Sequence, residues 1–450
     1  MTDTDPEPTP GQRSQAAVRA VLRDFADLDG PGLVVDAPPG AGKSTLVVAA
    51  ALDFAARGEP CIIVAQTNNQ IDDLIERLAA ESPAVGLGRL SGSEYPPTPA
   101  IAALRDSGAL TVDTSVERLG ACGLIFATAA KWAWVDDRRY PCAIVDEAYQ
   151  MRSDLLLQVA PRFERAMFVG DPGQLDPFSI VETPRWKGLP HDPTDSAVEV
   201  LLNHHPGLPQ HRLPLSWRLG ANAAHVVSRA FYPFLGFTAG TGAGDRSLEF
   251  TTRGLHSPYD ETLAVAARNG WALHELPSRH VPRTDPETAV AVARIAARLL
   301  ERRPLATCER HPGGRELNAG DIAVGVAHRD QADQIRTLLR DHPVPGARDI
   351  TVDTANRLQG REYEVTVISH PLSGRRDATS FHLEAGRLCV LASRHRHACI
   401  LVARAGIADL LDSHPSTEPV HLNVQAKFPD GWEAHQELLN HLSAFRIRVR

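Results

Sequence analysis

One glycine-rich stretch constrains the fold of this chain most, because it predicts what must precede and follow it. Residues 37–45 read Ala-Pro-Pro-Gly-Ala-Gly-Lys-Ser-Thr. The apolar run 32–35 before them indicates a short buried strand, and the apolar run 46–52 after them indicates a helix. A glycine loop between a strand and a helix offers backbone N–H groups and the positive end of the helix to an anion. The stretch therefore predicts a phosphate-binding loop in an α/β domain.

The loop residues have distinct expected roles toward a nucleotide. Lys43 is expected to reach the β- and γ-phosphates, and the Ser44 hydroxyl is expected to bind Mg²⁺. The first position of the pattern is Ala37 instead of glycine. A glycine-rich turn without catalytic use is the alternative, and the flanking strand and helix argue against it. The residues expected to surround the phosphates are Pro39, Gly40, Ala41, Gly42, Lys43, Ser44 and Thr45.

Apolar runs with polar ends recur along the chain. In the first half they cover 61–65, 123–128, 142–147 and 166–171. A second series follows, with helices expected at 286–302 and 331–340 and strands at 321–327, 365–369 and 399–403. Strand–helix units that are polar at each strand C-terminus predict an α/β fold of doubly wound parallel sheets with ligands at that edge.

These series divide the chain into expected domains. We expect a first domain over 1–205, a second over 206–408 with a possible insertion at 236–285, and a C-terminal extension over 409–450. The last residues, 445–450, alternate between apolar residues and arginine. Alternation of this kind favours an edge strand with its arginines pointing outward over a basic arm.

Composition excludes several classes of protein. With 43% hydrophobic and 23% charged residues, the chain has the composition of a soluble globular protein, and no apolar run approaches a membrane span. Six scattered cysteines, several inside apolar runs, indicate reduced thiols and a cytoplasmic protein, and Cys308 and His311 lack the second ligand pair of a zinc site. The net charge of −8 means that nucleic acid could bind only in a local groove.

Two carboxylates end the predicted strand at 142–147. In the sequence Asp146-Glu147-Ala148-Tyr149-Gln150, Asp146 is expected to hold Mg²⁺ through water and Glu147 to polarise the attacking water. An acidic pair at this place is otherwise a helix N-cap. The next signal, Gly170-Asp171-Pro172-Gly173-Gln174-Leu175-Asp176-Pro177, would by itself indicate only a turn.

Taken in order, these motifs resemble those of superfamily 1 helicases, in particular the branch that contains the nonsense-mediated-decay helicase. The second half continues the resemblance, which covers roughly residues 9–405. The stretches that carry it are 9–13 (Q motif), 37–45 (Walker A), 146–150 (Walker B), 170–177 (motif III), 215–218 (motif IV), 352–362 (motif V) and 387–396 (motif VI). The resemblance implies two tandem RecA-like domains, hydrolysis of ATP with Mg²⁺, and movement on single-stranded DNA or RNA, 5′-to-3′.

The resemblance also implies roles for single residues. Gln12 would read the adenine, with Gln15 as a competitor for that role, and Trp217 would stack on the base. Glu362 would bind the ribose. Gln174 would sense the γ-phosphate, and Arg218 and Arg394 would contact it from the second domain. The residues expected to face the nucleic-acid backbone are Thr67, Asn68, Thr128 and Thr354.

Other functions stay open at this point. The protein could be an ATP-dependent switch or loader that binds nucleic acid or an unidentified partner protein without unwinding. A nucleoside kinase or GTPase would explain the phosphate loop alone and would leave the later motifs without a role. Trp132 and Trp134 could stack on bases, although their spacing on one strand face favours core packing.

Overall fold

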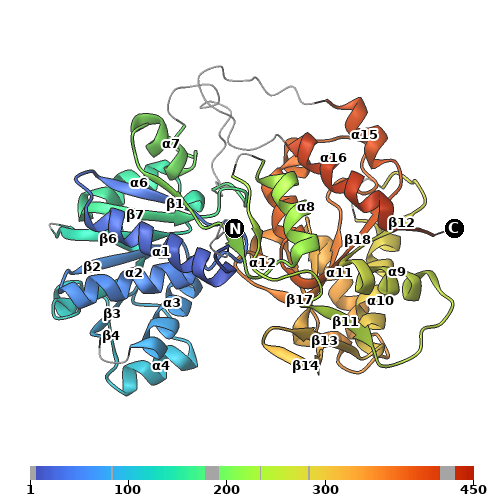
Figure 1. Ribbon diagram of the computed structural model, residues 1–450, viewed down its shortest axis with the longest axis horizontal. Helices are drawn as coiled ribbons and strands as arrows, with labels where there is room; N and C mark the ends of the chain where they lie inside the picture. Colours follow the sequence, from blue (N-terminus) through green and yellow to red (C-terminus); the bar gives the residue numbers. More distant parts are fainter. Residues whose placement is uncertain are drawn as a thin grey trace, which may run out of the picture. The chain divides into compact units, whose positions relative to one another are not determined.

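The computed structural model describes residues 7–82, 85–136, 138–177, 192–233, 235–281, 284–415 and 431–449. The chain forms two compact units (Figure 1). The first unit comprises Met1–Pro172 and Asp176–Pro214, and the second comprises Gly173–Leu175 and Leu215–Arg450. None of the helices in the described ranges combines the length and the apolar character needed to cross a lipid bilayer.

The first unit is built on a parallel sheet with the strand order β4-β3-β5-β2-β6-β7-β1-β8. Figure 1 shows this order running from β1 through β7, β6 and β2 to β3 and β4. Its strands are β1 Gly32–Asp36, β2 Cys61–Ala65, β3 Leu87–Leu90, β4 Leu110–Asp113, β5 Leu124–Thr128, β6 Tyr140–Asp146, β7 Phe163–Gly170 and β8 Gln210–Arg212. The central strands are buried along their length, which explains why they read as continuous apolar runs.

Helices cover both faces of this sheet. They are α1 Pro10–Ala26, α2 Lys43–Arg57, α3 Asn68–Glu81, α4 Pro99–Asp106, α5 Ala129–Trp132, α6 Ser153–Val159 and α7 Ala197–His204, with short 3₁₀ turns at Glu117–Leu119, Ala148–Gln150 and Ala160–Arg162. Side chains alternate along each strand, so Leu33 and Val35 pack in the core with α1 to α3, while Val34 packs in the core with α5 to α7.

The second unit is built on another parallel sheet, with the order β16-β15-β17-β18-β12-β19. Its strands are β12 Trp271–Leu276, β15 Ile322–Val326, β16 Thr351–Thr354, β17 Tyr363–Ser369, β18 His395–Arg404 and β19 Arg446–Arg448. Smaller sheets pair β9 Leu215–Ser216 with β10 Thr238–Ala239, and β13 Pro304–Cys308 with both β11 Ser247–Phe250 and β14 His311–Glu316. Cys308 and His311 face each other across β13 and β14.

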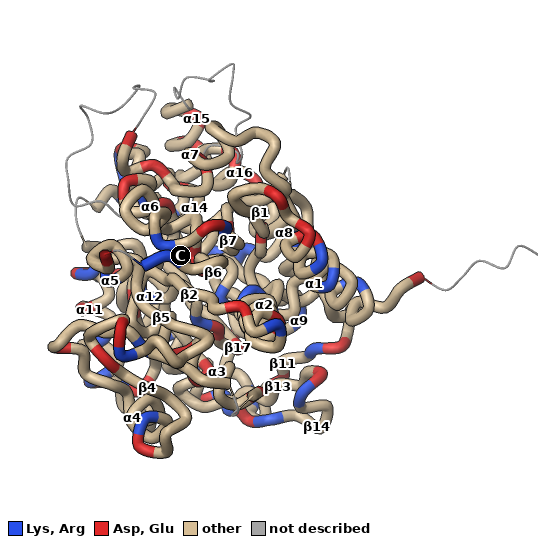
Figure 2. Tube along the Cα trace, turned by 90° about the vertical axis from the view of Figure 1, so that its left-hand side faces the viewer, with Lys and Arg blue, Asp and Glu red and all other residues tan. Residues whose placement is uncertain are grey.

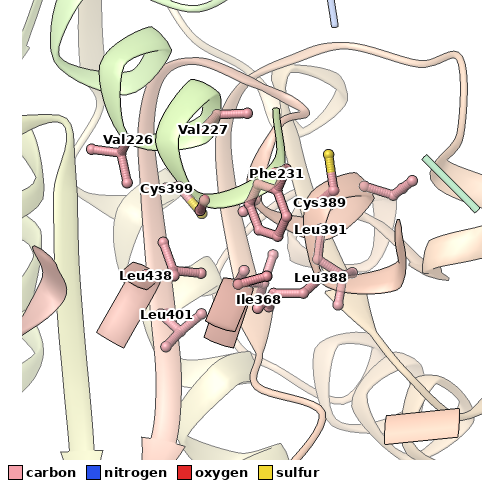
Figure 3. Close-up of a cluster of buried hydrophobic side chains, with 14 of the residues drawn as sticks. Val226, Val227, Phe231, Ile368, Leu388, Cys389, Leu391, Cys399, Leu401 and Leu438 are labelled. Carbon is pink, nitrogen blue, oxygen red and sulfur yellow. The ribbon is translucent and has the colours of Figure 1, made fainter. Parts of the chain in front are cut away.

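Helices also cover both faces of the second sheet. They are α8 Ala221–Phe231, α9 Pro258–Asn269, α10 Pro286–Glu301, α11 Arg329–Arg340, α12 Ala355–Leu358, α13 Ser380–Leu383, α14 Ala385–Ala392, α15 Ile407–Ser413 and α16 Gly431–Leu442, with 3₁₀ turns at Ala319–Asp321, Ala347–Asp349 and Ser443–Phe445. Figure 3 shows one core layer, which includes Phe231 of α8, Leu388 of α14 and Leu401 of β18. The neighbouring residue Ile400 belongs to the opposite layer with α9 to α11.

The predicted fold class is confirmed: the chain contains two tandem RecA-like, doubly wound parallel α/β domains. The structure divides the chain differently from the sequence analysis. Residues 206–214 carry β8, which pairs with β1 of the first unit. The expected insertion at 236–285 contains β12, an inner strand of the second sheet, and the expected extension at 409–450 supplies α16 and β19 to the same unit.

The period-two pattern near the C-terminus does form an edge strand, as expected. Strand β19 pairs in parallel with β12 at the end of the second sheet. Arg446 and Arg448 both reach Glu275 of β12, at 3.3 and 3.4 Å. These ion pairs explain why arginine alternates with apolar residues at this edge.

Candidate nucleotide-binding site

The loop between β1 and α2 has the geometry of an anion site. Gly40 and Gly42 have φ angles of +71° and +90°, a left-handed backbone that favours glycine. Gly42 is the N-cap of α2, so it offers no capping side chain, and Leu46 N–H donates to its carbonyl at 2.9 Å. The N–H groups of the first helical turn lie ahead of that bond and have no carbonyl within the helix to pair with. This turn is therefore suited to bind phosphate oxygens.

A buried lysine–carboxylate cluster lies beside this loop. Asp146 ends β6, Glu147 follows it, and both are at least 95% buried. Lys43 Nζ lies 2.6 Å from Asp146 Oδ1 and 2.7 Å from Glu147 Oε1. Burial lowers the pKa of Lys43, but the two carboxylates outweigh it and raise that pKa well above its usual value. The ammonium group is therefore charged at neutral pH.

The backbone at Glu147 is unusual. Its φ of +50° lies in the left-handed region, which costs a residue with a side chain roughly 1–3 kcal/mol. Gln150 Nε2 donates to Glu147 Oε2 at 2.7 Å, and Glu147 N–H donates to Asp146 Oδ1 at 2.9 Å. These contacts hold the carboxylate in one orientation. Strain of this kind concentrates at functional sites, where the surrounding structure stabilises it.

The donor atoms of this cluster fit Mg²⁺. Carboxylate and hydroxyl oxygens are hard donors, and Asp146 and Ser44 supply them. The ammonium of Lys43 against Asp146 shows that the carboxylate accepts a cation there. Among the described residues, no group of three or more His, Cys, Asp or Glu side chains is arranged to hold a metal ion. Mg²⁺ suits a site with few protein ligands, because it retains waters and binds substrate phosphates.

Tyr149 is a site residue that the sequence analysis did not single out. Its hydroxyl donates to Asp36 Oδ1 at 2.6 Å, and Asp36 is the last residue of β1 before the loop. Gly170 lies so near that a Cβ there would be 2.9 Å from Tyr149 Cδ2. Tyr149 therefore connects the turn that holds Glu147 to the strand that carries the loop. Tyr149 occupies the fourth position of the sequence Asp146-Glu147-Ala148-Tyr149-Gln150, where the motif accepts any residue. The sequence analysis therefore had no reason to select it.

Gln12, the expected adenine reader, has a structural role at the start of α1. Thr9 N–H donates to Gln12 Oε1 at 2.8 Å, and Gln12 N–H donates to Thr9 Oγ1 at 3.3 Å. This reciprocal capping box fixes the N-terminus of the helix. The carboxamide oxygen of Gln12 is therefore engaged in capping the helix.

Several of the expected second-domain residues gather in one place. Arg218 Nε lies 3.3 Å from Glu362 Oε2, and its Nη1 donates to the Ser393 carbonyl at 3.3 Å. Arg394 is 99% buried, and it donates to the Val390 carbonyl at 3.1 Å and to Ser393 Oγ at 2.9 Å. Motifs IV, V and VI therefore meet around Ser393. Trp217 is half-buried, and a Cβ on Gly240 would lie 2.7 Å from its ring.

A further ion-pair cluster adjoins these arginines. Arg246 Nη2 and Arg396 Nη2 lie 2.8 and 2.6 Å from Glu309 Oε1. Partial burial raises the pKa of Glu309, but these guanidinium groups lower it to about 2. Arg396 also lies 3.6 Å from Glu362 Oε1. The sequence analysis missed Arg246 and Glu309, because neither lies within a recognisable motif.

The segment that contains Gln174 belongs to the second unit. A Cβ on Gly173 would lie 2.4 Å from the Tyr232 ring, and a Cβ on Gly386 would lie 2.5 Å from the Gln174 carbonyl oxygen. Leu175 is buried in the same hydrophobic cluster as Phe231 and Leu388. The segment 173–175 is thus anchored in the second unit, although the residues on both sides of it belong to the first.

Both halves of the chain match AAA domain families. One AAA domain family (AAA_30) matches residues 10–183, which include the loop at 37–45 and the pair Asp146–Glu147. Another AAA domain family (AAA_12) matches residues 272–406, which include Glu362 and Arg394. No curated protein matches the chain significantly.

Solved structures similar to the chain include viral helicases. The crystal structure of arterivirus nonstructural protein 10 (helicase) is 14% identical, with a TM-score of 0.44 over 86% of this chain and 61% of that one. A complex of the arterivirus protein with DNA is 14% identical, with a TM-score of 0.43 over 88% and 65%. The PRRSV helicase is 14% identical, with a TM-score of 0.39 over 92% and 56%. The chain spans less than two-thirds of each of these proteins.

Within the AAA_30 match, the expected nucleic-acid contacts lie at neighbouring strand ends. Ala65 of β2 pairs with Thr128 of β5. Thr67 caps α3 and Thr128 caps α5, each accepting a backbone N–H at 3.3 Å. Asn68 Oδ1 accepts from the buried guanidinium of Arg89 at 2.7 Å. In the AAA_12 match, Thr354 ends β16 and is buried.

The two tryptophans that the sequence analysis paired lie in different environments. Trp132 is fully buried at the end of α5, and its Nε1–H donates to the Ile63 carbonyl at 3.4 Å. Core packing is confirmed for Trp132 and wrong for Trp134, which is 84% exposed. The segment is a helix and a turn instead of a strand, so the two side chains do not share a face.

Proposed function

We propose that this protein is an ATP-dependent helicase or translocase that moves on single-stranded DNA or RNA. The observation that carries the proposal is the cluster of Lys43, Asp146 and Glu147 beside the loop at 37–45, at the carboxyl edge of a RecA-like sheet. This edge is where doubly wound folds bind nucleotides. The later motif-like stretches and the two AAA-domain matches support the same assignment.

In the proposed reaction the residues of the first unit bind and position the substrate. The N–H groups of the loop and of the first turn of α2 receive the phosphates, and Lys43 moves from the carboxylates to the β- and γ-phosphates. Ser44 and Asp146 would hold Mg²⁺, which would neutralise phosphate charge when bound. Glu147 orients a water molecule and accepts its proton, while Gln150 keeps the carboxylate in place.

The second unit is proposed to supply positive charge and coupling. Arg218 and Arg394 would approach the γ-phosphate, and Gln174 would relay its presence to the second core through Leu175. Trp217 and Glu362 would contact the base and the ribose. These roles follow from the resemblance and from the meeting of the motifs around Ser393.

The nucleic-acid track is proposed to run past the strand ends that carry Thr67, Asn68, Thr128 and Thr354. Figure 2 shows basic and acidic residues interspersed along the chain, consistent with the net charge of −8. Binding would therefore depend on a local groove. We propose 5′-to-3′ movement from the family resemblance. A cytoplasmic location is supported by the six cysteines, all of which lie within the described ranges and are free of disulfides.

The test is an ATPase assay run in parallel with single-stranded DNA and single-stranded RNA, followed by a strand-displacement assay. We expect nucleic acid to stimulate ATP hydrolysis, and we expect Lys43→Ala to abolish the hydrolysis. Stimulation without strand displacement would indicate a switch or loader. If the rate of ATP hydrolysis does not change when nucleic acid is added, the proposal is refuted.

A further inference from the structure

Trp134 is an exposed aromatic side chain in the first unit to which the proposed mechanism gives no role. It follows α5, two residues after Trp132, and its side chain is 84% exposed. Tryptophan offers a large aromatic surface, and leaving it in water forfeits the free energy that burial would provide. A partner that covers the ring would recover that free energy.

The backbone around Trp134 is held on both sides. Trp134 N–H donates to the Lys131 carbonyl at 3.2 Å, and Val135 N–H donates to the Trp132 carbonyl at 3.1 Å. Trp132 and Val135 are both buried. The indole is therefore presented on a fixed frame, which lowers the conformational entropy that binding must remove.

Trp134 and α5 lie several strands away from the phosphate-binding loop. Helix α5 begins at Ala129, directly after Thr128 at the carboxyl end of β5. This strand end lies next to the end of β2 that leads to Thr67 and Asn68. In the sheet order β5-β2-β6-β7-β1, the strand β5 lies four places from β1 and the phosphate loop. Lys131 Nζ donates to the Thr114 carbonyl at 3.1 Å, which ties α5 to the segment that follows β4.

We propose that Trp134 is a base-stacking contact for a single strand that passes this part of the sheet edge. This proposal rests on the proposed function. Every base has an aromatic face, so one exposed indole can stack on the bases of a single strand regardless of their sequence. The nearby exposed Asp136 would repel phosphate, and the proposal assigns the attraction to the aromatic ring. A protein partner that binds mainly through apolar contacts would need a broad apolar patch, whereas the neighbouring Lys131 and Asp136 are polar.

The experiment measures binding of the full chain, with a non-hydrolysable ATP analogue, to oligothymidylate and to a strand of equal length without bases. Trp134→Ala should weaken binding to oligothymidylate roughly 5- to 100-fold and leave binding to the abasic strand unchanged. Trp134→Phe should retain most of the affinity. The slope of log affinity against log salt should stay the same, because no phosphate contact is lost. Leu255→Ala removes another exposed apolar side chain, 69% exposed, and serves as the matched control.

Each outcome bears on a different proposal. If wild type binds neither strand, the proposed function fails, and the stacking proposal fails with it. If wild type binds oligothymidylate and Trp134→Ala binds it equally well, only the stacking proposal is overturned. Equal weakening toward both strands would show a backbone contact and would also overturn it.

Discussion

Glu147 has a strained backbone conformation, and contacts with Lys43 and Gln150 hold its carboxylate in place. This arrangement supports the proposed role of Glu147 as the general base. We expect Glu147→Gln to bind ATP normally and to hydrolyse it roughly 10²- to 10⁴-fold more slowly, because a general base is lost. Nucleotide binding and turnover measured on the same preparation would check this. Glu164→Gln, at an exposed position on β7, is the control. Normal turnover by Glu147→Gln would remove Glu147 from the mechanism.

Tyr149 gives a second prediction at the level of one hydrogen bond. Tyr149→Phe removes the donor to Asp36 without changing the shape of the ring. Hydrogen bonds to carboxylates contribute about 1.5–3 kcal/mol, so the free energy of unfolding should fall by about that amount. Urea denaturation would measure it. An unchanged unfolding midpoint would show that the bond does not stabilise the turn around Glu147.

Glu309 gives a prediction about pH. Its pKa is lowered from 4.5 to about 2 in the folded protein, so its ion pairs contribute stability above pH 4.5 that is lost as the pH falls toward 2. Glu309→Gln should therefore be less stable than wild type at neutral pH, and the difference should shrink over that window. Thermal unfolding at several pH values would measure it, with the exposed Glu249→Gln as the control. A difference that stayed constant with pH would contradict the ion-pair explanation.

At the scale of elements, two helix-start glycines form a matched pair. Each is the second residue of its helix, Gly386 in α14 and Gly11 in α1. A Cβ on Gly386 would lie 2.5 Å from the Gln174 carbonyl oxygen, whereas one on Gly11 meets nothing nearer than 4.0 Å. Gly386→Ala should destabilise the second unit by about 1–3 kcal/mol and reduce stimulated ATP turnover. Gly11→Ala should be neutral or slightly stabilising. Equal effects in chemical denaturation would contradict the close approach.

The elements were predictable where a local pattern decides them. The glycine loop at 37–45 and the apolar runs each indicate their structures within a few residues. The pairing of strands far apart in the chain leaves no local pattern, so β12 could not be placed inside the second sheet, or β8 in the first, from the sequence alone. Trp134 shows the same limit. A period-two spacing predicted a strand face, but Thr128 starts a helix there, and a helical turn sends Trp132 and Trp134 in different directions.

Across the whole molecule, the two units divide the proposed chemistry between them. The first unit holds the phosphate loop and the carboxylates, and the second holds Arg394. Arg394→Lys should still bind ATP and single strands, but it should lose most nucleic-acid-stimulated turnover, since arginine fingers contribute roughly 10³–10⁵ in rate. Arg348→Ala, at an exposed position of the same unit, is the control. Stimulated turnover within a few-fold of wild type would refute a role for Arg394 across the two units.

The contact of Lys43 with both carboxylates also bears on the order in which ligands bind. The ammonium group is tethered to the site, so it competes with any free cation at a high effective concentration. Free Mg²⁺ alone should therefore have little access to Asp146. A nucleotide whose phosphates bind Lys43 would at the same time leave the carboxylates of Asp146 and Glu147 accessible to Mg²⁺. In the proposed mechanism, Lys43 thus blocks the metal site until a nucleotide binds.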